Sequence, residues 1–206
     1  MCFDHGCTNG GTPDPSFVDP RRAPEQVKWT DTIGTVATGN TLSRNVATTG
    51  TKVEDFNAGA ASVQIITKGD AWVEFEANDN MVSQVLGVRE SCDDPTACPD
   101  TDPSLNDIGF SIILNNDQHI YVIESSPSVQ VFGPFGTTYN AHDRFRVHVT
   151  DNSDGTATIS YSQIIAGVDT PLYQHVGPNP KYPLRIDATF REQNATLGNV
   201  TVMRIQ

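Results

Sequence analysis

The chain has 206 residues, of which 37% are hydrophobic and 18% are charged, a length that suits one folded domain with a single core. Its 25 acidic and 13 basic side chains give a formal net charge of −12, which argues against nucleic acid or an anionic membrane surface as a partner. No segment approaches the roughly 18 apolar residues of a membrane-spanning helix, so we expect no membrane insertion.

The beginning of the chain has the composition of a linker, with Gly10, Gly11 and several prolines. We expect an N-terminal extension over residues 1–26 and one β domain over residues 27–206. Such a tail is ordered only if something holds it, so we expect it to pack on its own domain or on a neighbouring chain. The extension contains no apolar export segment, so a secreted form is expected to be a mature chain or a fragment of a longer protein.

Four cysteines occur as two local pairs, Cys2 with Cys7 and Cys92 with Cys98, and neither pair has C-x-x-C spacing. Four cysteines allow three connectivities, and closeness in sequence favours these two pairs. A metal site that includes His5 is an alternative, but two short-loop disulfides are the preferred interpretation. Disulfides predict an extracellular or cell-surface location, outside the reducing cytosol.

From Val27 onward, apolar and polar residues alternate with period two in short runs that turn residues separate, as expected for strands. Two hairpins are predicted, 107–114 with 119–124 and 144–150 with 156–162, the second through an Asp-Gly turn. Further strands are predicted at Val27–Ile33, Thr41–Val46, Ala61–Thr67, Ala71–Glu76, Ser83–Val88, Leu184–Phe190 and Val200–Ile205. About a dozen short antiparallel strands predict an all-β sandwich or barrel.

Polar rows on three of these strands suggest a ligand-binding surface. Side chains alternate between faces along a strand, so the polar residues of 144–150, 156–162 and 183–190 are expected on the non-core face of one sheet. A row of arginine, histidine, aspartate and hydroxyl groups suits a polyhydroxylated ligand, while an ordinary solvated face is the alternative. The predicted ligand-binding residues, with one tyrosine added as a stacking candidate, are Tyr121, Arg144, Arg146, His148, Arg185 and Asp187.

Two acidic patterns in the sequence are candidate sites of chemistry. Glu74 and Glu76 share one strand face, and paired carboxylates carry out glycoside hydrolysis, but alternate carboxylates on an edge strand usually serve solubility. We therefore expect no catalytic residue. Carboxylates around the second cysteine pair offer oxygen ligands for Ca²⁺, although acidic loops are commonly only solvated and no cofactor is required. The candidate calcium ligands are Asp93, Asp94, Asp100 and Asp102.

Trp29 and Trp72 are expected to fill the core. A series of short sequence motifs occurs in the same order as in a known family. The motifs are Trp29, Gly39-Asn40-x-Leu42, Phe56–Ser62, Gly69–Phe75, Leu86-Gly87, Asp107-Ile108, Tyr121-x-x-Glu124, Asp143–Val147 and Tyr182-Pro183-Leu184. This series resembles bacterial concanavalin A-like lectin/glucanase modules of surface and secreted proteins.

The resemblance implies a jelly-roll of two antiparallel sheets, with the polar rows on its concave face. The chain departs from the family pattern in two places: the Cys92–Cys98 loop looks inserted, and Tyr161 to Gly167 replace the usual Tyr-x-Asn-Gly hairpin. The Glu-x-Asp-x-x-Glu signature of laminarinase-type relatives is also absent, which disfavours catalysis. We therefore expect a non-catalytic extracellular module that binds a glycan or another cell-surface ligand. The alternative is a structural subunit of an extracellular filament or surface assembly, whose N-terminal extension contacts the next copy. A glycoside hydrolase or lyase that uses Glu74 and Glu76 is a third hypothesis.

Overall fold

The computed structural model describes residues 23–45, 56–94, 96–101, 104–125, 128–136 and 138–205. The expected Cys2–Cys7 disulfide, most of the N-terminal extension and the candidate ligand Asp102 lie outside the described residues. Among the described residues, no helix has the length and apolar character needed to cross a membrane.

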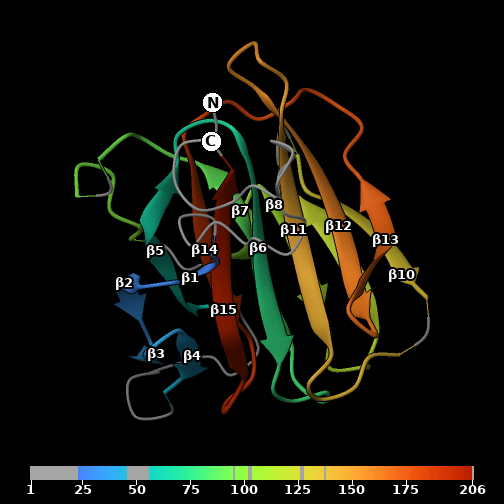
Figure 1. Cartoon of the computed structure of the whole chain (residues 1–206). Helices are drawn as coiled ribbons and strands as arrows, with labels where there is room; N and C mark the ends of the chain where they lie inside the picture. The colour runs from blue at the N-terminus through green and yellow to red at the C-terminus, as the bar shows by residue number, and fades with distance from the viewer. Residues whose placement is uncertain are drawn as a thin grey trace, which may run out of the picture.

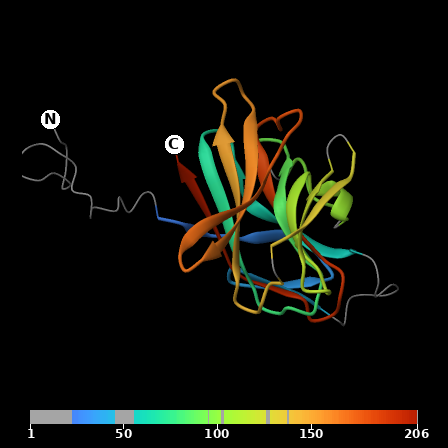
Figure 2. The same ribbon diagram turned by 90° about the vertical axis from the view of Figure 1, so that its right-hand side faces the viewer.

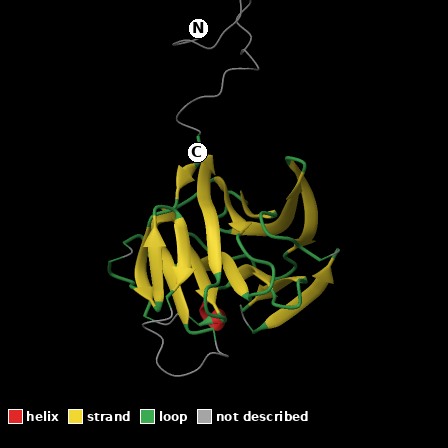
Figure 3. Ribbon diagram, turned by 90° about the horizontal axis from the view of Figure 1, so that it is seen from below, coloured by secondary structure: helices red, strands yellow, loops and turns green. Residues whose placement is uncertain are grey.

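The described strands form two antiparallel sheets that pack face to face, seen edge-on in Figure 2 and from below in Figure 3. The sheet nearer the viewer in Figure 1 has eight strands. They are β1 (Glu25–Gln26), β3 (Thr35–Thr38), β4 (Thr41–Arg44), β6 (Asp70–Ala77), β11 (Arg144–Asp151), β12 (Ala157–Ile165), β13 (Val168–Gln174) and β15 (Thr196–Ile205). Their order is β13-β12-β11-β6-β15-β4-β3, and β1 pairs with β15.

The second sheet, behind the first in Figure 1, has seven strands. They are β2 (Trp29–Ile33), β5 (Ala58–Ile66), β7 (Gln84–Glu90), β8 (Phe110–Leu114), β9 (Ile120–Glu124), β10 (Gln130–Phe135) and β14 (Leu184–Phe190). Their order is β10-β9-β8-β7-β14-β5-β2, and a short 3-10 helix at Leu105–Asp107 precedes β8. This arrangement confirms the predicted all-β, two-sheet jelly-roll sandwich.

The core lies between the sheets and follows from the period-two pattern. Phe75, Val147 and Ile159 face inward from the eight-stranded sheet and meet Leu86 and Ile186 of the other sheet in one buried cluster. Complete burial of such a side chain stabilises the fold by about 1.5–3 kcal/mol. Because side chains alternate along a strand, the residues between these inward-facing ones on β6 and β11 point toward solvent.

A polar cluster joins the two sheets inside the sandwich. Glu124 of β9 is buried and accepts a hydrogen bond from the Tyr161 hydroxyl of β12 at 3.1 Å. Its other carboxylate oxygen lies 2.8 Å from Nδ1 of His175. Each polar group therefore has a partner, which removes most of the cost of burying it.

The strands not predicted from the sequence are β1, β3, β10 and β13, and the last two contain proline. Pro134 and Pro171 interrupt these segments, and a proline within a run argues against a strand. Proline is tolerated here because each strand lies at the end of its sheet, where one row of backbone groups has no neighbouring strand. The two edges approach each other through Phe132 and Tyr173, whose ring centroids are 4.4 Å apart.

Candidate functional site

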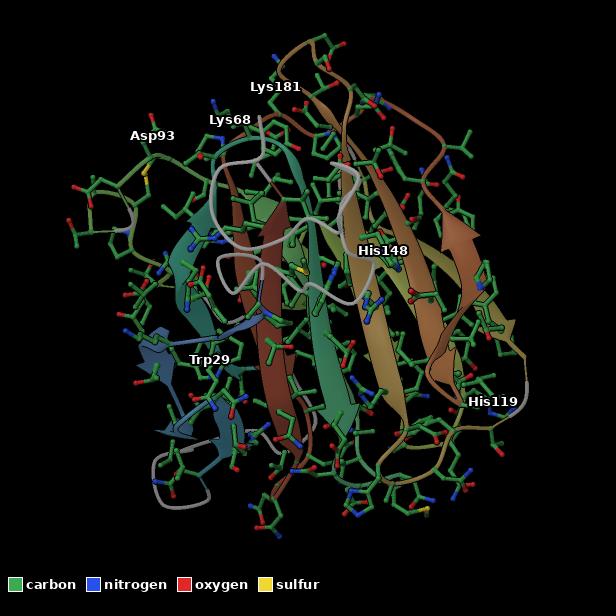
Figure 4. All side chains as sticks on the ribbon, in the orientation of Figure 1. Trp29, Lys68, Asp93, His119, His148 and Lys181 are labelled. Atoms are coloured by element: carbon green, nitrogen blue, oxygen red, sulfur yellow. A yellow bond between two sulfur atoms is a disulfide. The ribbon has the colours of Figure 1, made fainter. Side chains whose placement is uncertain are left out.

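The solvent-facing side of β6, β11, β12 and β13 carries a continuous polar surface, which we call the polar face. It consists of Trp72, Glu74, Glu76, Arg144, Arg146, His148, Ser160, Ser162 and Asp169. Strand register builds it, because Arg144 lies opposite Glu76, Arg146 opposite Glu74 and His148 opposite Trp72. Figure 4 shows His148 near the middle of the front sheet, on β11.

Glu74 is the centre of the polar face, with only 5% of its surface exposed. Nε and Nη2 of Arg146 donate to its Oε2 at 3.2 and 2.5 Å, and Arg144 donates to its Oε1. Its strand, β6, lies between β11 and β15, so the expectation that these carboxylates sit on an edge strand is wrong. A buried carboxylate needs such partners, and here two arginines supply them.

Arg146 connects Glu74 to the neighbouring strands. Its Nη1 donates to Oδ2 of Asp169 at 2.6 Å, and the guanidinium carbon lies 4.3 Å from the Trp72 ring centroid. A guanidinium stacked on indole and paired with two carboxylates is held in one orientation. The polar face is therefore organised before any ligand arrives.

His148 forms the far end of this network. Its Nε2 lies 2.9 Å from Oγ of Ser162 and 3.3 Å from Oδ1 of Asp169, and Ser162 donates to the same Oδ1 at 2.8 Å. Burial lowers the pKa of His148 below 6.5, the charge of Arg146 lowers it further, and Asp169 opposes both effects. His148 is therefore a neutral imidazole at pH 7.

Glu76 lies at the other end of the polar face. Nδ1 of His142 is 2.5 Å from its Oε1, and the side-chain amide of Asn199 donates to its Oε2 at 2.7 Å. Partial burial alone would raise the pKa of Glu76, but these hydrogen bonds outweigh it and hold the pKa below its ordinary value. A general acid for glycoside cleavage needs a raised pKa, so Glu76 is unsuited to that role.

Two hollows open on the polar face. The β6–β11 depression, of about 620 Å³, is lined by Pro24, Trp72, Glu74, Glu76, Arg144, Arg146, Asn199 and Thr201. The β12–β13 pocket, of about 380 Å³, is lined by His148, Ser160, Tyr161, Ser162, Asp169, Pro171, Leu172, Tyr173 and Gln174. Arg146 lines the first hollow and holds Asp169 in the second, so the network links them.

The expectation that Arg185 and Asp187 share this face is wrong. They belong to β14 of the seven-stranded sheet and are 0% and 1% exposed. Arg185 donates to Asp31 at 2.7 Å and to the Cys98 carbonyl at 3.1 Å, and Asp187 lies 3.1 Å from Nε of Arg89. Alternation shows which residues share one side of a strand, but it does not show which sheet the strand joins.

Tyr121 also lies away from the polar face, on β9 of the seven-stranded sheet. It packs against the small apolar cluster that contains Ile113 and Ile123, and its hydroxyl donates to Asp117 at 3.2 Å. Of the six predicted ligand-binding residues, the structure therefore brings together only Arg144, Arg146 and His148.

The loop with the candidate calcium ligands is closed by the predicted Cys92–Cys98 disulfide. Its described aspartates diverge. Asp94 accepts hydrogen bonds from Thr96, Asp100 lies 3.7 Å from Arg89, and Asp93 borders a separate hollow. Figure 4 shows Asp93 on a loop beyond the edge of the front sheet. Within the described ranges, no three acidic, histidine or cysteine side chains are arranged to hold a metal.

Sequence reasoning missed two residues of the polar face. Trp72 was expected in the core, but it faces outward with Glu74, while Trp29 does pack against the core. The signal was present, because Ala71, Val73 and Phe75 alternate with Trp72 and Glu74. Asp169 had no such signal, since its strand β13 was not recognised.

No protein-family model and no curated protein matches the sequence. Among solved structures, the PSpry domain of TRIM65 matches with a TM-score of 0.51 and 12% identity, over 88% of this chain and 93% of that one. A human SPRY domain matches with a TM-score of 0.51 and 15% identity, over 82% of this chain and 94% of that one.

The exoplasmic/lumenal domain of VIP36, in its Ca²⁺- and Man3GlcNAc-bound form, matches with a TM-score of 0.51 and 11% identity. This match covers 88% of the present chain and 84% of the VIP36 chain. At these identities the likeness concerns the fold, and the resemblance to concanavalin A-like modules holds at that level.

Proposed function

We propose that this protein is a non-catalytic binding module that recognises a glycan, free or on a cell surface, through its polar face. The observation that carries the proposal is the linked network of Glu74, Arg146 and Asp169 on a solvent-facing sheet. Its side chains are already held in place, so little conformational entropy is lost when a ligand binds. Mixed donors and acceptors beside Trp72 suit a ligand with many hydroxyl groups.

The comparisons support a binding role by analogy of fold. The VIP36 domain was solved with a mannose-containing saccharide, and its sandwich has the same two-sheet form. We propose an extracellular or cell-surface location, of the kind expected for modules of secreted proteins, and the Cys92–Cys98 disulfide supports it. Protein side chains supply the donors and acceptors of the polar face, so this mode of binding requires no cofactor.

Two other hypotheses have weaker support. A glycoside hydrolase that uses Glu74 and Glu76 would need one protonated carboxylic acid, but Glu74 is paired with two arginines and the pKa of Glu76 is lowered. A filament subunit whose N-terminal extension adds a strand to the next copy would meet Pro134 or Pro171 at β10 or β13. The opposite edges, β2 and β3, contain no proline, and most of the extension lies outside the described residues.

The test is a glycan array with the intact protein, followed by calorimetry on any saccharide that it retains. Arg146→Ala removes the centre of the network, and we expect it to weaken binding by roughly 1–3 kcal/mol, the scale of a lost charged hydrogen bond. The matched control is Arg204→Ala, whose side chain pairs with Glu25 away from the polar face and whose affinity should match the wild type.

Retention of full affinity by Arg146→Ala would contradict the proposal. So would an array on which the intact, folded protein binds no saccharide at high concentration. Circular dichroism and thermal melting of each variant separate lost binding from lost folding.

A further inference from the structure

We propose that the glycan unit in contact with the polar face is an uncharged sugar held in the β12–β13 pocket, with Asp169 as its main hydrogen-bond acceptor. In this proposal Arg146 is a positioning residue that orients Asp169. The inference rests on the proposed function and names the class of ligand and the place where it binds.

Every nitrogen of the Arg146 guanidinium already donates to a protein carboxylate, which leaves one further N–H on each of Nη1 and Nη2. Its Nε and Nη2 donate to Glu74, its Nη1 donates to Asp169, and Trp72 lies beside the guanidinium plane. An arginine that recognises a carboxylate or sulfate of a ligand offers two parallel donors to it. Here both ends of the fork are already bound to protein carboxylates.

The charge of the β12–β13 pocket also disfavours an acidic sugar. The side chain of Asp169 is 40% exposed, so an anionic ligand would meet a carboxylate at the pocket wall. His148, the neighbouring titratable group, is neutral at pH 7 because burial lowers its pKa. The described lining of the pocket contains no arginine or lysine, and the charge of the adjacent Arg146 is already shared between Glu74 and Asp169.

The side chains of the β12–β13 pocket offer more hydrogen-bond acceptors than the protein's own donors occupy. The single hydroxyl proton of Ser162 goes to Asp169, so Nε2 of His148 must donate to Ser162. A neutral imidazole with its proton on Nε2 has an unprotonated Nδ1, which accepts a hydrogen bond. The Asp169 carboxylate has about four acceptor positions. Arg146 and Ser162 donate to it and Nε2 of His148 lies 3.3 Å from its Oδ1, so at least one position is left for a ligand. Hydroxyl groups of a sugar are the donors that match these acceptors.

The shape of the pocket fits a sugar ring. Its volume of about 380 Å³ lies at the small end of the range for ligand pockets. The pairing of β12 with β13 shifts register between Tyr161 and Ser162, so Leu172 is an extra residue on β13. Leu172 and Tyr173 give the pocket an apolar wall for the C–H face of a sugar, and Phe132 stacks behind Tyr173.

The experiment compares two forms of one oligosaccharide, a uronic-acid form and its carboxyl-reduced neutral form, alongside neutral oligosaccharides found on the array. Calorimetry uses the intact protein and two Asp-to-Asn variants. Asp169→Asn removes the negative charge of the proposed acceptor. Asp154→Asn is the matched control, because Asp154 is an exposed turn residue whose carboxylate accepts a hydrogen bond from the backbone N–H of Thr156. We expect the neutral form to bind more tightly than the acidic form. We also expect Asp169→Asn to lose at least tenfold in affinity while Asp154→Asn binds like the wild type.

Arg146→Gln tests the positioning role with a second readout. We expect weaker binding of the neutral form and, in NMR titrations, a higher pKa of His148, because a nearby positive charge is removed. Arg146→Lys is expected to restore part of the His148 pKa shift but not the affinity, since an ammonium group cannot span Glu74 and Asp169.

Tighter binding of the acidic form, or full affinity in Asp169→Asn, would overturn the inference. If Arg144→Gln abolished binding while Asp169→Asn retained it, the ligand would occupy the β6–β11 depression, and the proposed function would stand without this inference. If no saccharide of either charge bound, both the inference and the proposed function would fall.

Discussion

Arg146 illustrates how the environment of a residue decides what it can do. In the sequence it is an arginine on a polar strand face, which suggests direct contact with a ligand. In the structure every guanidinium nitrogen is bound to a protein carboxylate, so the residue orders its neighbours instead. Whether Arg146 can contact a ligand directly depends on which residues lie opposite it on the neighbouring strands. Only the register of the sheet gives those neighbours.

His148 makes binding and stability sensitive to mildly acidic pH. Its folded pKa lies below 6.5, so as the pH falls from 6.5 to that lower pKa, the unfolded chain binds the proton more readily. The free energy of unfolding therefore decreases as the pH falls through this window. We expect His148→Gln to reduce this pH dependence, measured by urea unfolding at several pH values. An unchanged slope in the variant would contradict the assignment. Glycan affinity should weaken at lower pH, as the pH falls through the folded pKa itself, because protonation there converts Nδ1 from an acceptor into a donor.

Asp187 has the opposite behaviour. Burial raises its pKa well above 3.8, and the nearby Asp100 carboxylate raises it further, while Arg89 opposes both. Above pH 3.8 the unfolded chain releases this proton and the folded protein keeps it, so the free energy of unfolding falls as the pH rises toward the folded pKa.

Asp187→Asn replaces the carboxyl group, whose pKa burial raises, by a neutral amide of similar shape. We expect the free energy of unfolding of the variant not to fall as the pH rises above 3.8, and the variant to be at least as stable as the wild type at pH 7. Chemical unfolding between pH 4 and 8 measures both quantities. A large loss of stability at pH 7 would show that Asp187 is ionised and that its pairing with Arg89 holds the segment in place.

At the scale of elements, close contact between β7 and β8 depends on a glycine. A Cβ at Gly87 would lie 2.1 Å from the Phe110 carbonyl oxygen and 2.6 Å from Cα of Ser111, both backbone atoms. Gly87→Ala must therefore move one strand, and we expect a loss of about 1–3 kcal/mol in the free energy of unfolding. Gly109→Ala is the control, because its new Cβ would meet its nearest atom at an ordinary 3.5 Å. Equal stability of the two variants would contradict this account.

Strands with clear alternation could be predicted from the sequence, and β14 has the predicted bounds. The hairpin of β11 and β12 was also predicted, since its Asp-Gly turn and apolar rows are local features. Edge strands with proline were not, because they depend on partners far along the chain. The candidate site was predicted in part for the same reason. Arg144, Arg146 and His148 share one strand, whereas Asp169 and Trp72 reach them only through sheet pairing.

At the scale of the whole molecule, the two sheets have different outer surfaces. The eight-stranded sheet exposes the polar face. On the seven-stranded sheet, Arg185 and Asp187 are covered, and Arg185 binds the carbonyl of Cys98 in the disulfide loop. A binding module of this form should therefore use one side of the sandwich for its ligand and the other for stability.

Hydrogen exchange with and without a bound neutral oligosaccharide tests this claim most directly. It reports protection along every strand of the intact protein. We predict slower exchange in β11, β12 and β13 on binding, with no change in β7, β8, β9 and β14. Protection confined to the seven-stranded sheet or to the Cys92–Cys98 loop would contradict the assignment of the polar face as the binding surface.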